Sequence, residues 1–270
     1  MDKRKLFLSE EEKAELSRRK KIRAGRLLFA VVLVCGWEGL VRLGWLDSYF
    51  WSCPTAIAEA IRQLFRKGSL IKDILYTSGE TILGFLGGTV LGSAVGLGFW
   101  WSKTAAGISE PYLVLFNAVP KMALGPVLVI LFGIGFPSKV ILAFLMTVVN
   151  SAVSAYSGVR SVDPALETLL SSLGARRGQI FTKVVVPWSM PWIISCLRVN
   201  IALALAGAIV GEYISSRHGV GRMIINAGTV LDITMVWAGV VILSVLSMVM
   251  YGGVVLLEKW LSRHCSAAHS

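Results

Sequence analysis

The sequence predicts an all-α, polytopic membrane protein with about six transmembrane helices. Hydrophobic residues make up 55% of the 270 residues and charged residues 16%, so a water-soluble chain would lack the polar surface to cover its core. The apolar residues come in blocks of about 20, the length that crosses a bilayer as a helix. Lys and Arg are also distributed unevenly between the segments that connect these blocks.

The apolar blocks divide the chain into three parts. The expected spans are 27–45, 78–101, 112–134, 139–157, 191–213 and 234–257. An even number of spans places both ends of the chain on the same side of the membrane. We therefore expect a basic head at 1–26, a transmembrane domain at 27–257 and a tail at 258–270, with head and tail in the cytoplasm.

The basic residues indicate which side is the cytoplasm. Roughly ten Lys and Arg residues lie in the head, and a basic segment directly before a span usually sets topology rather than binding nucleic acid. We expect an inner-membrane protein in contact with lipid, with no nucleic-acid partner. No cleavable signal peptide is expected, because the charged stretch precedes the first apolar block. With the head inside, the outer segments hold only Arg62, Arg66, Lys67, Lys72, Arg217 and Arg222.

The first span and the segment after it carry two local patterns. Glu38 and Arg42 are one helical turn apart, so we expect them to form an ion pair that lowers the cost of each charge in lipid. Residues 54–67 begin with Pro54 and alternate apolar and charged residues at helical spacing. This pattern predicts a short helix on the outer surface.

A repeat of small residues marks one face of the second span. Gly84, Gly88, Gly92 and Gly96 recur at a spacing of four, which places them along one side of a helix. Another helix must approach this side closely, and we expect that helix to come from the same chain.

Prolines interrupt the third span. Pro120 and Pro126 flank Lys121, and prolines without a backbone N–H mark broken helices at membrane sites. We therefore expect Pro120, Lys121 and Pro126 to line a route through the protein. Ionisable residues in spans face a bundle interior or a water-filled cavity. Glu80, Arg198 and Glu212 are further candidates for this route, with pairing between Glu80 and Arg198 as the alternative.

The longest inner loop, 158–190, contains a predicted short helix. Asp163 followed by Pro164 is a good helix start, with an oxygen cap and a preset φ. Leucines at 166, 169, 170 and 173 then fall on one face, and Gly174 can end the helix in a left-handed conformation. This face either packs under the bundle or serves as a docking surface.

The spacing after this helix resembles the EAA loop of ABC importer permeases. Pro187 lies thirteen positions after Gly174 and follows Val184 and Val186, similar to that family's Gly, nine residues, Ile, one residue, Leu-Pro pattern. The sequence departs from the family at the Glu-Ala-Ala positions, which are Thr168, Leu169 and Leu170. The nearest acid is Glu167, one residue early.

The resemblance covers most of the chain after the head. The run from Pro120 to Pro126, continuing to Phe132-Gly133-Ile134-Gly135, is similar to the permeases for nitrate, sulfonate, taurine and thiamine precursors. Pro187, Pro191, Leu197-Arg198, Glu212 and Gly219-Val220-Gly221 follow in that group's order.

The resemblance implies a binding-protein-dependent importer for a small solute such as nitrate, bicarbonate, taurine, another sulfonate or a thiamine precursor. Two permease copies, as a homodimer or a heterodimer, would form the path, and a substrate-binding protein would deliver the solute from outside. Two ATPase subunits would bind ATP and Mg and grip a cytoplasmic coupling-helix loop on each permease. The coupling residues would be Leu166, Glu167, Thr168, Leu169, Leu170, Leu173, Gly174, Ala175, Arg176, Arg177, Gly178 and Pro187.

Other functions find less support in the residues. No Gly-x-x-x-x-Gly-Lys-Ser/Thr loop occurs, so the ATPase must be another polypeptide and this chain needs no cofactor of its own. The four cysteines show no metal-ligand spacing, and no nucleophile and base or paired carboxylates indicate a membrane enzyme. An ion-gradient-driven secondary transporter fits the composition, but it has no need for the Gly-to-Pro loop, and the two halves show no inverted repeat.

Overall fold

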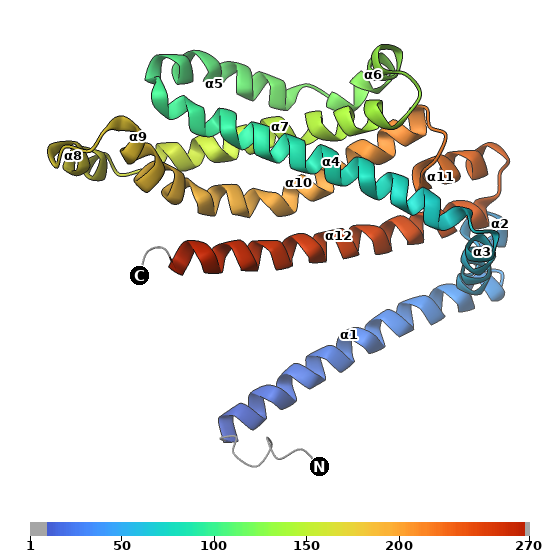
Figure 1. The fold of residues 1–270 in the computed structure, drawn as a ribbon. Helices are drawn as coiled ribbons and strands as arrows, with labels where there is room; N and C mark the ends of the chain where they lie inside the picture. The colour runs from blue at the N-terminus through green and yellow to red at the C-terminus, as the bar shows by residue number, and fades with distance from the viewer. Residues whose placement is uncertain (1–9, 268–270) are drawn as a thin grey trace.

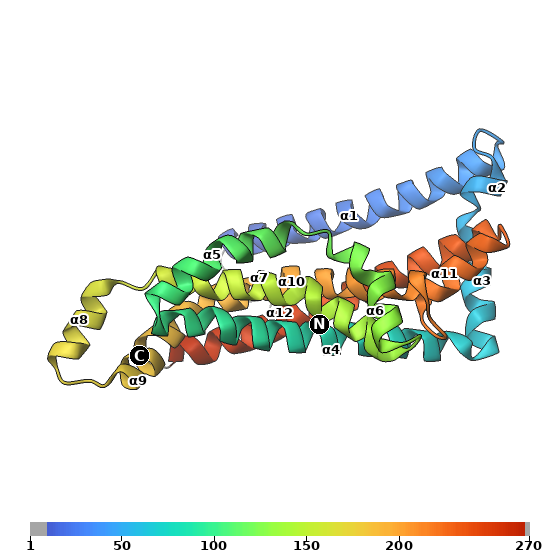
Figure 2. The ribbon, with the colours of Figure 1, turned by 90° about the horizontal axis from the view of Figure 1, so that it is seen from above.

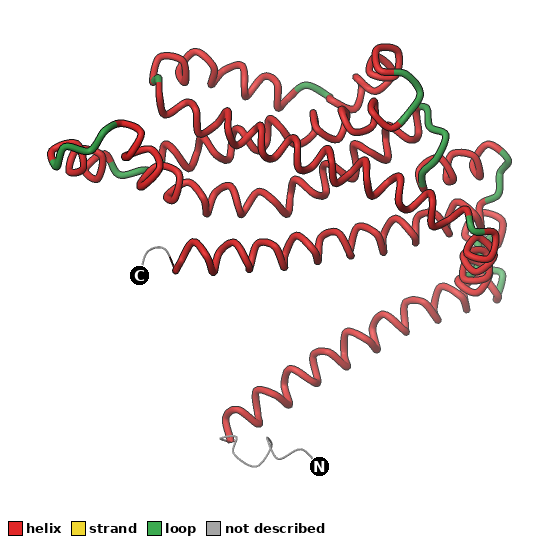
Figure 3. The backbone as a smooth tube through the Cα atoms, in the orientation of Figure 1, coloured by secondary structure: helices red, strands yellow, loops and turns green. Residues whose placement is uncertain are grey.

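The computed structural model describes residues 10–267, which are largely helical and contain no strand (Figure 3). The long helices are α1 (Glu10–Arg42), α4 (Ser69–Gly98), α5 (Lys103–Ala118), α7 (Phe136–Arg160), α10 (Val186–Ile214) and α12 (Ile233–Ala267). The shorter ones are α2 (Ser48–Trp51), α3 (Pro54–Lys67), α6 (Gly125–Phe132), α8 (Pro164–Ser172), α9 (Arg177–Ile180) and α11 (Val220–Thr229). Turns of 3-10 or π helix connect some of them: η2 (Phe99–Trp101), η3 (Lys121–Leu124) and η4 (Phe181–Val185).

The helices provide the expected number of membrane crossings. Within residues 10–267, the stretches long and apolar enough to cross alone are Ala24–Arg42, Ser69–Trp101, Phe136–Arg160, Arg177–Ile214 and Ile233–Ser262. The α5–α6 pair supplies a sixth crossing if it counts as one span. Helices α8 and α9 lie at one end of the bundle, and α2, α3 and α11 lie at the other (Figures 1 and 2).

The third span is broken rather than continuous. The sequence predicts one run over 112–134, whereas α5 ends at Ala118 and α6 lies at 78° to it. Val119 before Pro120 is extended, with φ −60° and ψ 131°, because the proline ring disfavours the helical conformation in the residue that precedes it. The prolines therefore interrupt the helix, so the predicted break in the third span is confirmed.

Several helices extend beyond the apolar blocks from which they were predicted. Helix α4 begins at Ser69 rather than near 78, α10 begins at Val186 rather than near 191, and α12 runs to Ala267. Helix α1 begins at Glu10, inside the basic head. Hydropathy marks only the part of a helix that faces lipid, whereas the backbone hydrogen bonds continue into water.

The glycine face of α4 packs against α7, so the prediction of a close partner from the same chain is confirmed. A Cβ atom added to Gly92 would lie 2.7 Å from Ser151 Cβ, and one added to Gly96 would lie 2.7 Å from Ala155 Cβ. Real Cβ atoms essentially never come so close to another heavy atom. Because these glycines have no side chains, the backbones of α4 and α7 come into contact. This contact forms the centre of the bundle.

A buried amide joins the three central helices. Asn200 of α10 is fully buried. Its Nδ2 donates to Ser151 Oγ of α7 at 2.7 Å and to Thr89 Oγ1 of α4 at 3.1 Å, while its Oδ1 accepts from Asn150 Nδ2 at 2.7 Å. These three partners come from neighbouring helices, so the bonds fix the register of α4, α7 and α10.

Helix α1 stands apart from the bundle along most of its length (Figure 1). At its outer end, Arg42 Nε donates to Glu38 Oε1 at 2.7 Å, which confirms the predicted ion pair. Glu38 also accepts from the backbone N and Oγ1 of Thr55, at 3.1 and 2.9 Å, and so attaches α1 to α3. The predicted helix at 54–67 is present as α3.

Candidate functional site

The short helix in the inner loop forms as its sequence predicts. The Asp163 side chain accepts from Ala165 N at 2.8 Å, and Pro164 occupies the first turn of α8. Gly174 has φ +80°, a left-handed conformation that costs an L-residue with a branched side chain considerable strain. Gly174 N donates to Ser171 O at 3.0 Å, and Ala175 N donates to Leu170 O at 3.0 Å, which closes the end of the helix.

The leucine face of α8 is presented to the outside. Leu169 is 57% exposed and Leu173 is 74% exposed, while Leu166 and Leu170 are half-buried. The alternative that this face packs under the bundle is therefore wrong for its outer half. Both views show α8 projecting from the end of the helical bundle (Figures 1 and 2).

The second half of the predicted loop is mostly helical. Helix α7 continues to Arg160, and α9, η4 and α10 form one helical stretch from Arg177 onward. The segment outside these two long stretches is therefore 161–176 rather than 158–190. Pro187 lies in the first turn of α10, directly after the π turn η4, and therefore inside this helical stretch.

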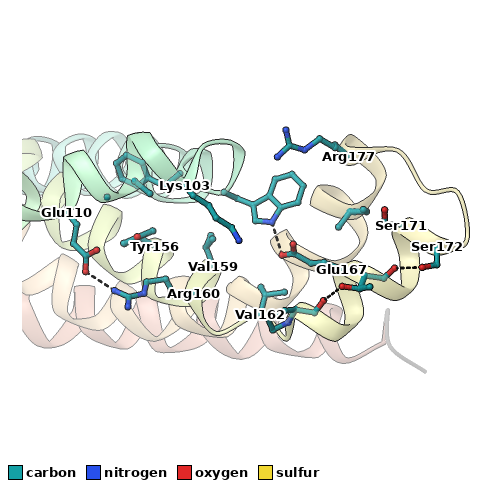
Figure 4. A pocket seen from close by; sticks show the side chains of 17 residues that line it. Lys103, Glu110, Tyr156, Val159, Arg160, Val162, Glu167, Ser171, Ser172 and Arg177 are labelled. Atoms are coloured by element: carbon teal, nitrogen blue, oxygen red, sulfur yellow. Dashed lines mark hydrogen bonds and ion pairs between the residues drawn. The ribbon is translucent and has the colours of Figure 1, made fainter.

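A cavity of about 820 Å³ lies between α8 and the end of the bundle. Its lining comes from the joint between α4 and α5, from the last turns of α7, and from α8 and α9. Glu110 and Arg160 lie at one end of the cavity, while Glu167 and Arg177 lie beside α8 and α9 (Figure 4). Arg160 Nη1 donates to Glu110 Oε1 at 2.7 Å, which neutralises that end.

A hydrogen bond between Trp100 and Glu167 spans this cavity. Trp100 Nε1 donates to Glu167 Oε1 at 2.9 Å. One residue along an α-helix corresponds to about 100° around its axis, so an acid at 167 points to a different side than an acid at 168 would. Thr168 instead donates to Pro164 O of its own helix at 2.9 Å. The shift of the acid by one residue therefore directs it toward the bundle.

The predicted route residues separate into two groups. Pro120 and Pro126 are exposed at the break between α5 and α6, and Lys121 Nζ donates to Asn117 O there at 3.2 Å. Glu80 and Glu212 are each 1% exposed. Their side chains lie among helices of the same subunit, where neither can contact a solute in this conformation.

The alternative pairing between Glu80 and Arg198 is wrong. Arg198 makes two hydrogen bonds to the Glu258 carboxylate of α12, at 2.6 and 2.9 Å. Glu80 instead interacts electrostatically with Glu212 and with Lys139 of α7. Lys139 is fully buried, and sequence reasoning missed it because its partners are distant in the chain.

The start of α11 is held by acidic and hydroxyl side chains of α4 and α10. Gly221 N donates to Glu212 Oε2 at 2.6 Å, and Val220 N donates to Thr77 Oγ1 at 3.0 Å. Gly219 N donates to Asp73 Oδ1 at 2.9 Å. The first N–H groups of a helix have no partners within it, and here three of them are satisfied by other helices. We define Asp73, Thr77 and Glu212 as the α11 cradle.

Among residues 10–267, no cluster of three or more His, Cys, Asp or Glu side chains could hold a metal ion. The features of the α8 end of the bundle and of the third span are α8 with its exposed leucines, the cavity behind it, and the break between α5 and α6.

Known proteins are similar to this chain in sequence and in fold over most of their length. The profile described as "Binding-protein-dependent transport system inner membrane component" matches residues 88–263. Taurine transport system permease protein TauC of Escherichia coli K12 is 28% identical over 252 residues, 92% of this chain and 90% of that protein. Formylaminopyrimidine transport permease protein ThiX of Halalkalibacterium halodurans is 28% identical over 237 residues, 86% and 92% of the two chains. An inward-facing MetNI methionine ABC transporter structure has the same fold, with a TM-score of 0.63 at 15% identity over 72% of this chain and 96% of that chain.

Proposed function

This chain belongs to the family of binding-protein-dependent transport system inner membrane components, and we propose how this ABC importer permease receives energy and passes its solute. A separate ATPase grips α8 on each of two permease copies. The two copies enclose the path, and an extracytoplasmic binding protein delivers the solute. ATP and Mg bind to the ATPase, and both ends of the permease lie in the cytoplasm.

The exposed leucine face of α8 is the observation that carries the coupling proposal. Leu169 and Leu173 lie on a preformed helix that projects from one end of the molecule. Exposed apolar side chains gain free energy when a partner removes them from water, about 1.5 to 3 kcal/mol for each leucine. A helix that stands off the bundle can also move with its partner without unfolding. The basic residues Arg176 and Arg177 lie beside it and add a charged rim.

The broken third span supports a path between two copies. Helices α5 and α6 expose large apolar side chains, among them Ile130 at 83% and Leu131 at 68%. At the break, Pro120 and Pro126 are exposed and Lys121 is half-buried. A second copy of the chain would cover part of this surface and leave the polar break beside the path. A homodimer is the simplest assembly that does so.

The relatives limit the class of solute. TauC is named for taurine and ThiX for formylaminopyrimidine, both small polar molecules. We propose that this importer carries a solute of that size, of the sulfonate or thiamine-precursor type. Nitrate and bicarbonate belong to the same range. Direct binding assays on the partner binding protein with taurine and formylaminopyrimidine would distinguish the first two classes.

Replacing Leu173 by aspartate is expected to weaken retention of the ATPase by the permease about 10- to 100-fold. The reason is that a carboxylate loses the free energy that a leucine gains when an apolar partner surface removes it from water. The measurement is the amount of ATPase that co-purifies with tagged permease from membranes. Val230→Asp is the matched control: Val230 is also 74% exposed, but it lies at the end of α11, far from α8 (Figure 1). Equal retention by both variants would contradict docking at α8.

Replacing Gly174 by valine is expected to uncouple ATP hydrolysis from uptake while the protein still inserts. A β-branched residue at φ +80° costs about 1 to 3 kcal/mol of strain, so the end of α8 must change its direction. Gly174→Asn is the control, since asparagine tolerates this conformation better than other L-residues. The assay compares solute uptake with ATP hydrolysis in reconstituted vesicles. Unchanged uptake in the valine variant would count against the coupling role.

A further inference from the structure

Residues from α8 and from the helical stretch that follows the loop both contact Trp100. Glu167 of α8 accepts the indole N–H at 2.9 Å. The Arg177 guanidinium of α9 lies over the same ring, with Cζ 5.6 Å from its centroid. The Phe181 ring of η4 packs against Trp100 at 5.6 Å between centroids. We define Trp100, Glu167, Arg177 and Phe181 as the Trp100 clasp.

Trp100 stands at a mechanical junction. It lies in η2, directly after α4 and just before α5 begins at Lys103. Helix α4 packs tightly into the bundle through its glycine face, whereas α5 has little packing against it and leads to the exposed break. A force applied at Trp100 therefore meets a fixed helix on one side and a more easily displaced helix on the other.

A second contact near the loop joins α7 to α5, where Arg160 donates to Glu110 at 2.7 Å. The clasp differs from that contact because Glu167 and Arg177 belong to α8 and α9 themselves. The 820 Å³ cavity lies between α8 and the α4–α5 joint, so Glu167 reaches Trp100 through a side-chain hydrogen bond across this space. A hydrogen bond with a charged acceptor and a cation over an aromatic ring are the stronger kinds of side-chain contact. Together they form a direct link across the cavity.

We propose that the Trp100 clasp transmits the movement of the coupling helix to α5, and thereby to the broken span beside the path. Trp100 is thus a positioning residue for transport that acts through α5. This role rests on the proposed function, because it requires an ATPase that moves α8. The proposal also gives a role to Glu167, the acid that lies one residue before the family's Glu position. Glu167 binds Trp100 at the joint between α4 and α5 of the permease itself.

The test measures movement directly and does not depend on the identity of the solute. In a variant without its native cysteines, spin labels are placed at Val114 of α5 and, separately, at Ser172 of α8, in the permease assembled with its ATPase. Distances between the labels of the two copies are compared before and after trapping with Mg-ATP and vanadate. Trp100→Phe keeps an aromatic ring but removes the N–H donor.

In Trp100→Phe and Glu167→Ala, trapping is expected to move the α8 label as in the parent, while the α5 shift is lost. Glu167→Gln should restore the α5 shift, because its side-chain oxygen still accepts the indole N–H. Trp101→Phe is the matched control, since Trp101 also packs on Phe181 at 5.6 Å but is not bonded to Glu167. A merely structural role would not be rescued by glutamine in this way.

Two results would overturn the proposal, and each is distinct from a failure of the proposed function. An α5 shift of parental size in both Trp100→Phe and Glu167→Ala would show that the clasp transmits nothing. Loss of the α5 shift in Trp101→Phe as well would attribute the effect to general packing. If no ATPase assembles with the parent, the proposed function itself fails before the clasp is tested.

Discussion

Replacing Glu212 by alanine is expected to release α11 and destabilise the folded subunit by about 1 to 3 kcal/mol, the cost of leaving a buried hydrogen-bond donor without an acceptor. Glu212 is 1% exposed and accepts from Thr77 Oγ1 and Gly221 N, both at 2.6 Å. Its removal leaves Gly221 N buried without an acceptor. Thr77 Oγ1 loses its closer acceptor and keeps only Asp73 O, at 3.1 Å.

The measurement is the thermal denaturation midpoint of the detergent-solubilised permease. Glu59→Ala is the control, because Glu59 pairs with Arg62 on α3 and their side chains are 50% and 64% exposed. A solvent-exposed ion pair contributes about 0 to 1 kcal/mol, so this variant should melt close to the parent. Similar midpoints for the two variants would contradict the role of the α11 cradle. Gly221→Ala should resemble Glu212→Ala, since its Cβ would lie 2.7 Å from Glu212 Oε2.

Replacing Gly92 by valine is expected to separate α4 from α7 and prevent accumulation of folded protein. The added Cβ would lie 2.7 Å from Ser151 Cβ and 3.0 Å from Val148 C, a backbone atom that cannot rotate away. Overpacking of this kind costs about 3 kcal/mol. Separation of α4 from α7 would remove the contact on which the positions of the other helices depend.

Expression and size-exclusion profiles of a fluorescently tagged permease report this effect. Gly98→Val is the matched control on the same helix, because a Cβ at Gly98 has nothing within 4 Å. We expect a monodisperse peak for Gly98→Val and aggregated or absent protein for Gly92→Val. A normal peak for Gly92→Val would mean that the two helices can move apart without loss of the fold.

Features that depend on neighbouring residues were predicted well from the sequence. Glu38 and Arg42 form their pair, and the run from Asp163 to Gly174 forms α8 with the expected start and end. In each of these cases, the interacting groups are within a few residues along the chain. Helical geometry then fixes their relative position whatever the rest of the protein does.

Contacts between residues that are distant along the chain could not be predicted from the sequence. The partner of Arg198 is Glu258 rather than Glu80, and the bond from Trp100 to Glu167 joins residues 67 positions apart. An interfacial position explains a tryptophan in this place equally well, so its residue type indicates no partner. Sequence periodicity shows which face of a helix is polar but not which helix lies opposite it.

The sequence by itself determined that the chain is a helical membrane protein, where its apolar blocks lie, and that a capped short helix follows Asp163. Only the tertiary structure decided the 78° break, the orientation of Glu167 and the burial of Glu212 and Lys139. The physical reason is the range of the interactions. Hydropathy, capping and helical spacing act within a few turns of chain, whereas burial and partner choice arise when α4, α7 and α10 pack together.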